Sequence, residues 1–283
     1  MLKKISALVV TLALCFALSA CGDSGQESGD ASGDKIVEMG MLSMANMDQD
    51  EMTKRANETN KVLNKDYTLH ITYYNSLSEM QMALASGKIN NMKLGLSCGE
   101  YISAKDTSMK VYNSQDVSES YDYSMMLLKE DKQLCDDISA ALEELSADGT
   151  LDRLTMEYID NCKSGEEPKT VELPVFEGAE TYTVAVTGDL PPMDFVASDG
   201  EPAGFNMALL AAISEKMQVN FETVSIESGA RAISLSSGDS DIVFWAISND
   251  EDGADIPEGA IVTAPYFSDS VVIVIPSGDE TVY

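Results

Sequence analysis

Hydrophobic and polar positions follow one another in blocks that predict strands and helices along most of the chain. Short apolar runs predict strands at 36–42, 67–74, 92–96, 124–128, 182–187, 219–226, 241–247 and 271–275. Apolar residues at helical spacing, or polar helix-permissive stretches, predict helices at 48–64, 76–84, 134–145, 151–159, 205–217 and 229–236. The second of these begins with Ser76-Leu77-Ser78-Glu79, which has the pattern of a capping box with Ser76 as the cap. Strands that alternate with helices indicate α/β units with largely parallel sheets.

The first twenty residues have the layout of an export signal. Lys3 and Lys4 precede the apolar run 5–18, which is too short to span a bilayer as a permanent helix. The small residues before Cys21 resemble the lipobox of bacterial lipoproteins, in which this cysteine is acylated and becomes the N-terminus. We therefore expect a signal peptide at 1–20 and a lipid on Cys21, with a cleaved signal and a chance cysteine as the alternative.

A polar stalk and a strong negative charge follow from the composition. Residues 22–34 hold no large apolar side chain and are rich in glycine, serine and acids, so we expect 21–34 to be a lipidated cysteine with a flexible stalk. The formal net charge is −30, which argues against nucleic acid as a partner. Because an anionic lipid surface also repels such a chain, we expect the lipid anchor to be its sole membrane contact.

A break in the pattern divides the folded part in two. Residues 163–179 contain two prolines and show no apolar periodicity, and they predict a linker between α/β units at 35–162 and 180–283. We expect a monomer anchored at the outer face of the bacterial cytoplasmic membrane or at the cell surface.

Motifs for catalysis or metal binding are missing from the sequence. His70 is the single histidine and lies in a predicted strand, where a structural role is expected. The sequence has no nucleophile elbow, phosphate-binding glycine loop or HExxH motif, so we expect no enzyme, no cofactor and no metal. One disulfide or three isolated thiols are both compatible with the remaining cysteines, which are Cys98, Cys135 and Cys162.

A series of short motifs in the second unit occurs in an order that is specific to one family. After the opening strand come Asp189-Leu190-Pro191-Pro192-Met193, Asp199-Gly200, Gly204-Phe205-Asn206, Ser237-Gly238, Asp241-Ile242-Val243 and Ala264-Pro265-Tyr266-Phe267-Ser268. With these motifs, residues 182–275 resemble the first lobe of the extracellular solute-binding proteins that feed ABC importers, in the polar-amino-acid-binding family (family 3).

The first unit resembles the second lobe of the same family, so the order of the lobes is reversed. Its matching motifs are Tyr74-Asn75-Ser76-Leu77, Ala85-Ser86-Gly87, Lys129-Glu130-Asp131 and Ala147-Asp148-Gly149-Thr150. Either the chain is one permuted clamshell, or it is a tandem protein whose second domain lacks its distal lobe. The resemblance implies an α/β fold of the two-lobed, type II periplasmic-binding-protein class, permuted or incomplete, with a ligand cleft at the lobe boundary.

The resemblance also implies where a ligand is contacted. In the lobe that begins near residue 182, the candidate ligand-binding residues are Asp189, Leu190, Met193, Phe195, Trp245, Ala246 and Ser248. In the other lobe they are Ser43, Asn46 and Ser97. Trp245 either forms an aromatic floor or packs in the core. Ser43 and Asn46 either present a helix N-terminus to the ligand or act as plain caps.

Two departures from the family change the expected ligand. Family members that bind amino acids hold the ligand carboxylate with an arginine just beyond the third strand, whereas this chain reads Ser248-Asn249-Asp250-Glu251-Asp252-Gly253 there. Arg231 lies in a predicted helix, and we expect it at the surface. Family members bind the ligand ammonium with an acidic residue, and in that region this chain has Gly95 and Ser97. The methionines Met39, Met41, Met44 and Met47 either fill the core or line an adaptable apolar cleft.

These observations predict a lipid-anchored solute-binding protein. We expect it to capture a small polar molecule other than a standard α-amino acid for an ABC permease. The alternative is a non-transport lipoprotein that uses degenerate lobes as a sensor or interaction module.

Overall fold

Helices and strands form where local sequence signals place them in most of the chain. A computed structural model describes residues 35–112 and 119–279, so the predicted signal, Cys21 and the stalk lie outside the described part. The strands are β1 (Lys35–Leu42), β2 (Tyr67–Tyr74), β3 (Asn91–Gly95), β4 (Met109–Tyr112), β5 (Ser120–Leu128), β6 (Thr181–Val186), β7 (Asp189–Leu190), β8 (Asp194–Val196), β9 (Pro202–Ala203), β10 (Asn220–Ser225), β11 (Ile242–Ile247), β12 (Ala260–Val262) and β13 (Phe267–Pro276). The α-helices are α1 (Gln49–Val62), α2 (Leu77–Ala85), α3 (Leu96–Lys105), α4 (Lys132–Ala147), α5 (Thr150–Tyr158), α6 (Phe205–Met217) and α7 (Arg231–Ser237).

Side-chain caps begin the first two helices. The Asp48 carboxylate accepts a hydrogen bond from the backbone N–H of Glu51 at 2.9 Å, and the Ser76 hydroxyl accepts one from Glu79 at 3.2 Å. Each bond satisfies one N–H group that has no partner within the helix. The cap predicted at Ser76 is therefore confirmed. The sequence pattern missed α3, β4, β7 and β12, which are short or lack clear periodicity.

The main sheet consists of two five-stranded parts with the same layout. Lobe A contains the strand order β2-β1-β3-β13-β4, and lobe B contains β10-β6-β11-β5-β12. In each lobe the fourth strand in this order runs antiparallel to both neighbours. The predicted α/β fold with two lobes is thus confirmed.

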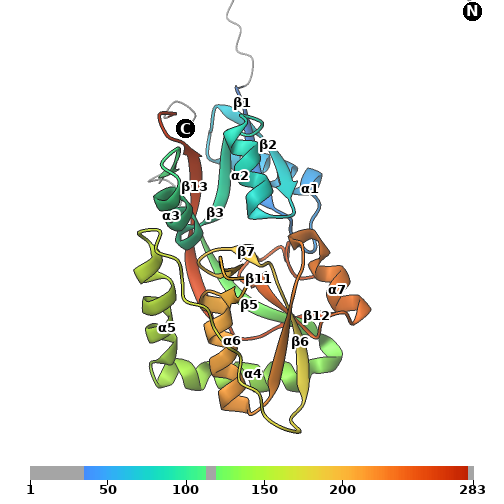
Figure 1. Ribbon diagram of the computed structural model, residues 1–283. Coiled ribbons are helices and arrows are strands. Elements are labelled where there is room, and N and C mark those ends of the chain that lie inside the picture. Colours follow the sequence, from blue (N-terminus) through green and yellow to red (C-terminus); the bar gives the residue numbers. More distant parts are fainter. Residues whose placement is uncertain (1–34, 113–118, 280–283) are drawn as a thin grey trace, which may run out of the picture. The chain divides into compact units, whose positions relative to one another are not determined.

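Each lobe receives its antiparallel strand from the part of the chain that forms the other lobe. Strand β5 follows lobe A in sequence but pairs with β11 and β12 of lobe B. Strand β13 pairs with β5 through residues 267–270 and with β3 of lobe A through residues 271–274. Figure 1 shows β13 passing from one lobe to the other. The two lobes therefore exchange strands, and residues 34–283 form one compact unit.

Residues 163–179, expected to link two units, run along lobe B. Val171 donates its backbone N–H to the Pro202 carbonyl at 3.0 Å, and Phe176 donates its own to Asn220 Oδ1 at 2.7 Å. Helices α4 and α5, which precede this segment, both pack on α6 of lobe B. The segment thus joins two parts of one lobe.

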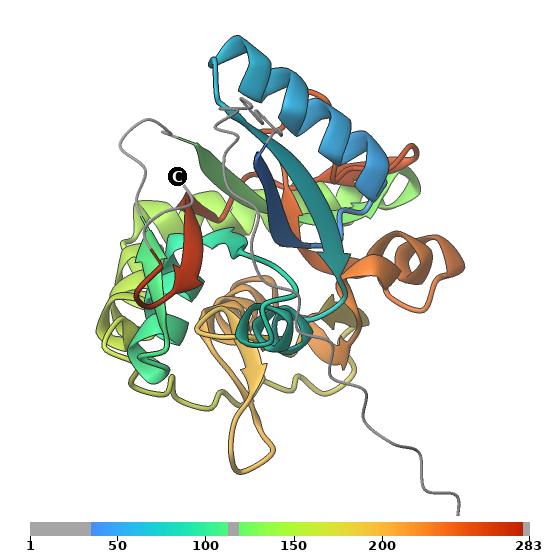
Figure 2. The same cartoon turned by 90° about the horizontal axis from the view of Figure 1, so that it is seen from above.

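Helices cover both faces of lobe A. Figure 2, which looks down on this lobe, shows α1 and α2 on opposite sides of β1 and β2. Met52 of α1 packs with Met39, Met41 and Ile71 in one cluster of buried residues, whereas Met80 of α2 belongs to a different cluster. The first of these clusters adjoins the lobe boundary described below.

Two further findings concern cysteines and membranes. Cys98, Cys135 and Cys162 are buried and free. Of the two alternatives, the structure therefore has three isolated thiols and not one disulfide. Within residues 35–112 and 119–279, no helix has both the length and the apolar character that a membrane span requires.

Candidate functional site at the lobe boundary

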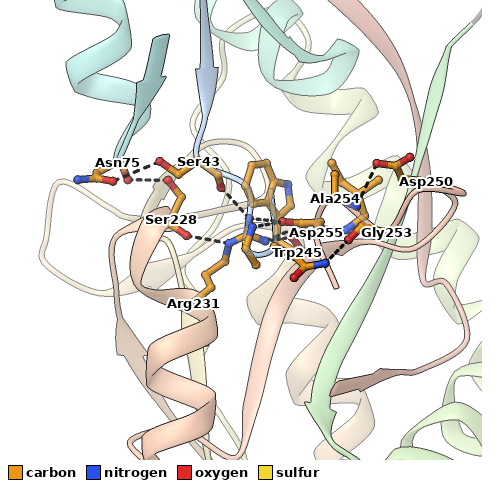
Figure 3. Close-up of polar contacts among 12 residues, drawn as sticks. Ser43, Asn75, Ser228, Arg231, Trp245, Asp250, Gly253, Ala254 and Asp255 are labelled. Carbon is orange, nitrogen blue, oxygen red and sulfur yellow. Dashed lines mark hydrogen bonds and ion pairs between the residues drawn. The ribbon is translucent and has the colours of Figure 1, made fainter. Parts of the chain in front are cut away.

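Direct hydrogen bonds join the lobes where β1 and β2 end (Figure 3). Ser228, just before α7 of lobe B, donates its backbone N–H to the Asn75 carbonyl at 3.0 Å and its hydroxyl to the Tyr74 carbonyl at 3.1 Å. The Ser43 hydroxyl, beyond the end of β1, donates to the same Tyr74 carbonyl at 3.2 Å. The two lobes are therefore in direct contact at this point.

Arg231 lies at the centre of this contact, and its predicted surface position is wrong. Its side chain is 1% exposed. The guanidinium donates to the carbonyls of Ser228 at 3.0 Å, Trp245 at 2.7 Å and Ser43 at 2.8 Å. Its two remaining N–H groups bind Asp255 at 2.9 and 2.6 Å. All five donors of the side chain are used, so the charge is satisfied within the protein.

Asp255 is the partner of Arg231 and also bridges the lobes. It is 1% exposed and lies in the loop between β11 and β12. Besides the two bonds from Arg231, its Oδ1 accepts the backbone N–H of Ala45 at 2.9 Å, and its Oδ2 accepts that of Ile247 at 3.0 Å. Ala45 belongs to lobe A and Ile247 to lobe B. One carboxylate therefore receives hydrogen bonds from both lobes (Figure 3).

Trp245 combines a strained backbone with aromatic contacts at the same place. Its φ of 72° lies in the left-handed region that non-glycine residues rarely adopt. Its ring stacks on Tyr123 at a centroid distance of 6.0 Å, and the Arg231 guanidinium lies 5.0 Å from the ring centroid. The residue is 8% exposed and packs at the lobe boundary.

Little space remains next to Trp245. The cavity there has a volume of about 20 Å³, which is room for about one water molecule and not for a metabolite. It is lined by Met41, Leu42, Met44, Lys93, Leu94, Gly95, Cys98, Tyr121, Tyr123, Leu190, Trp245 and Ile247. In this state the centre of the boundary is closed.

A much larger cavity of about 1360 Å³ opens beside this closed centre. Its apolar wall consists of residues from β1, the loop after β1, β2, β13 and α1, among them Met39, Met41, Met44 and Ile71. Its other side belongs to the acidic loop after β11, from Asn249 to Asp252, and to Asp255. Of the four methionines considered from sequence, Met39, Met41 and Met44 line this cavity, and Met47 packs beside the nearby core cluster.

The sequence-predicted site residues separate into two groups. Those at or next to the boundary include Ser43, Asn46, whose side chain donates to the Gly253 carbonyl at 2.8 Å, and Asp189, which accepts the Ser78 N–H at 3.1 Å. Leu190 and Trp245 line the small cavity.

The other predicted residues lie in packed or hydrogen-bonded positions. Met193 and Ala246 are buried, and Phe195 pairs with Asp189 in the small sheet of β7, β8 and β9. Ser248 bonds to Ser124 at 2.9 Å, and Ser97 donates its N–H to Asp269 at 2.9 Å. None of these contacts involves a ligand.

Burial changes the ionisation of two acids near the boundary. Desolvation raises the pKa of Asp194, although hydrogen bonds from Thr187, Gly188 and Asn206 oppose this shift. Desolvation likewise raises the pKa of Asp269, against the hydrogen bond from Ser97. No group of histidine, cysteine and acidic residues within the described ranges has the arrangement of a metal site.

Sequence reasoning missed Arg231 and Asp255, the two central residues. Arg231 is one of two cations after Glu180, the other being Lys216. This rarity was the one available signal, because a lone arginine in an acidic segment has few ways to avoid pairing with an acid. The sequence contains no signal that distinguishes Asp255, because it is one of several acidic residues in the same loop.

Comparison with known proteins gives one sequence match and several distant structural likenesses. Residues 182–282 match the model of "bacterial extracellular solute-binding proteins, family 3". No curated protein matches the chain.

Three solved structures illustrate the structural likenesses. The ligand-binding component of an ABC-type import system from Staphylococcus aureus, with zinc bound, is 11% identical, with coverage of 86% of this chain and 66% of that one and a TM-score of 0.44. An ABC transporter periplasmic substrate-binding protein from Coxiella burnetii is 11% identical, with coverage of 87% and 86% and a TM-score of 0.45. A pheromone cOB1 precursor/lipoprotein of the YaeC family from Enterococcus faecalis V583 is 12% identical, with 87% of each chain covered and a TM-score of 0.47.

The chain thus spans just under two thirds of the Staphylococcus aureus protein. The sequence match shows that residues 182–282 are similar to the bacterial extracellular solute-binding proteins of family 3.

Proposed function

We propose that this protein is a lipid-anchored solute-binding protein that captures a small molecule outside the cell for an ABC importer. The observation that carries the proposal is the pair of α/β lobes with matching strand order, joined by crossing strands and meeting in a polar boundary. Two lobes connected in this way can open and close around a solute. The family 3 match of residues 182–282 supports the same function.

We place the solute in the larger cavity beside the closed centre. The cavity has apolar walls with polar groups at one side, which is the usual composition of a small-molecule site. Asn60, which lines it and is 8% exposed, has a side-chain N–H₂ without a hydrogen-bond partner. A ligand acceptor next to this amide would therefore compensate a buried donor.

The charges around the cavity define the ligand class. Asp250, Glu251 and Asp252 lie on one side, and two of them bind Arg55, with N···O distances of 2.6 Å to Asp250 and 3.1 Å to Asp252. The whole lining holds six acidic residues against the three cations Arg55, Lys65 and Lys93, so an anionic ligand is disfavoured there. We propose a neutral or cationic solute with an apolar body.

We also infer that the chain is one permuted clamshell rather than a truncated tandem. In support, each lobe has five strands, and neither lobe lacks its distal part. The segment 163–179 joins α5 and β6 within lobe B, as expected of a connection between the former ends of an unpermuted chain.

A thermal-shift screen of the purified protein against metabolites tests the function, because a ligand that prefers the native state raises the melting temperature. For any hit, Met44→Ala removes a cavity wall, and we expect about tenfold weaker binding from the loss of one side-chain contact. Met156→Ala is the matched control, because Met156 is an exposed residue of α5.

Two results would contradict the proposal. If no metabolite of any class raises the melting temperature, the lobes do not bind a solute. If a hit binds equally well to wild type and Met44→Ala, the solute site lies elsewhere.

A further inference from the structure

We propose that Asp255 is an internal ligand: its carboxylate fills a carboxylate-binding site formed by both lobes and holds them together without a solute. When Asp255 is shortened, this site accepts a free monocarboxylate as small as acetate. The proposal concerns the centre of the boundary and not the neighbouring cavity, and it holds or fails independently of any importer.

The site has the donors that a carboxylate requires. Arg231 offers two parallel N–H groups at 2.6 and 2.9 Å, which is the bidentate geometry that suits this anion. The backbone N–H groups of Ala45 and Ile247 complete the set at 2.9 and 3.0 Å. All four donors contact the two carboxylate oxygens and none contacts another atom of Asp255. A free carboxylate of the same size can therefore make the same four bonds.

Packing alone does not explain the arrangement. A buried ion pair stabilises a fold no better than apolar residues of similar size, because both ions must lose their water. This pair, at 1% exposure for each side chain, is nevertheless placed where the lobes meet. The strained Trp245, with its φ of 72°, supplies one of the carbonyl acceptors of Arg231. Strain and buried charge at one position are typical of functional sites.

Asp255 differs from a free ligand because it is covalently part of a loop of lobe B. The residue lies in a loop, between β11 and β12, rather than in a strand or a helix. The loop is in turn fastened to lobe A, because Asn46 donates its backbone N–H to the Ala254 carbonyl at 2.9 Å and its side chain to Gly253 at 2.8 Å. The carboxylate thus brings the loop of lobe B onto the β1 loop of lobe A.

Loss of the carboxylate leaves the arginine without a counterion. Arg231 would retain three carbonyl partners, from Ser228, Trp245 and Ser43, but its charge would be uncompensated at a position closed to water. Either the lobes open to hydrate the guanidinium, or an anion enters. Asp255→Gly provides the space for such an anion, because acetate has the size of the CH2–COO− group that this substitution removes.

Acetate titration of Asp255→Gly tests the site. We expect the melting temperature of this variant to fall below that of wild type and to rise by about 5 °C in saturating acetate, with sodium chloride at equal ionic strength as the reference. Acetamide, which has the same shape without the charge, should produce no rise. Wild type and Asp241→Gly are the matched controls and should not respond to acetate. Asp241 is a carboxylate of lobe B that caps the Thr183 N–H at 2.7 Å.

A second variant tests whether the carboxylate holds the lobes together. Asp255→Asn keeps the side-chain volume but places an N–H₂ group against the guanidinium, so we expect a larger radius of gyration in small-angle scattering and no response to acetate. If Asp255→Gly does not fold in chloride, recovery in acetate alone supports the site. Equal effects of acetate, acetamide and chloride on Asp255→Gly, or a wild-type radius for Asp255→Asn, would overturn the proposal.

Discussion

The guanidinium of Arg231 and the carboxylate of Asp255 face each other through two hydrogen bonds of 2.6 and 2.9 Å, and each side chain is 1% exposed. Removal of one partner leaves the other as an unpaired buried charge. We therefore expect Arg231→Met to lower the free energy of unfolding by about 3–5 kcal/mol. Urea denaturation of the purified protein measures this loss.

The exposed pair of Arg55 and Asp250 provides the control for this measurement. Arg55 is 37% exposed, so Arg55→Met should cost no more than about 1 kcal/mol. Equal losses in Arg231→Met and Arg55→Met would mean that Arg231 is hydrated in solution and that the lobes are open.

The pH dependence of stability should reveal Asp269. Burial raises its pKa above the usual 3.8, so the folded protein holds this proton more tightly than the unfolded chain does. The contribution to stability is fully present below pH 3.8 and is lost as the pH rises through the raised value. We expect the stability of wild type relative to Asp269→Asn to decrease as the pH rises from about 4 to 7.

Asp250 should show the opposite sign in the same experiment. The hydrogen bond from Arg55 lowers its pKa below 3.8, so its contribution is present above pH 3.8 and is lost as the pH falls through the lowered value. Urea denaturation of Asp250→Asn and Asp269→Asn over a series of pH values gives both profiles. Parallel profiles for the two variants would contradict the prediction.

The permuted order can be tested by rewiring the chain. Strands β13, β3 and β1 are adjacent, so the end of β13 and the start of β1 are about 14 Å apart, which is two strand spacings across the sheet and three residues along it. A chain that begins at Gly165, joins Asp279 to Lys35 through about five glycine and serine residues and ends at Ser164 should fold with a melting temperature close to that of wild type. Thermal denaturation followed by circular dichroism measures the melting temperatures of the rewired chain and of wild type.

Separate expression of residues 35–162 and 180–279 is the complementary experiment. Each piece lacks one inner strand of its lobe, β13 in the first and β5 in the second, so we expect neither to unfold cooperatively. Cooperative unfolding of both pieces would support the tandem alternative.

Membrane attachment should depend on Cys21. We expect Cys21→Ser to move the protein from the membrane fraction to the soluble fraction, because residues 22–34 offer no large apolar side chain to the bilayer. Cys15→Ser, which alters a cysteine inside the predicted signal, should leave the protein in the membrane fraction. Membrane retention of Cys21→Ser in cell fractionation would refute the lipid anchor.

Free α-amino acids should bind weakly. Their carboxylate requires a cation or several N–H donors to replace its lost hydration, and all five donors of Arg231 are already used. Lys216, the other cation after Glu180, pairs with Asp148 and Glu144. Calorimetric titration with the twenty amino acids should give Kd values above about 1 mM. Micromolar binding of glutamate that Arg231→Ala abolishes would show that Arg231 leaves Asp255 for the ligand.

Elements with strong local signals were predictable from the sequence, and elements defined by distant partners were not. The polar cap at Ser76 and the apolar face of α6 gave correct bounds to within a few residues. By contrast, β12 has three residues and β4 has four, and each is stabilised by pairing with a strand far away in sequence. Such strands carry little periodicity of their own.

The candidate site was harder to predict than the fold. Ser43 and Trp245, two of the predicted ligand contacts, lie at the lobe boundary, where Ser43 follows β1 and Trp245 belongs to β11. The predicted surface position of Arg231 was wrong because a position in a helix does not indicate which face of that helix another lobe covers. Its burial depends on the Ser43 carbonyl, 188 positions away along the chain.

The strand exchange between lobes affects how the chain can fold as it is made. Lobe A obtains its inner strand from β13, which lies near the C-terminus, so most of the protein is synthesised before the first lobe can be completed. A nascent chain must therefore keep β1, β2 and β3 from aggregating until β13 arrives. Contacts so far apart in sequence make folding slow.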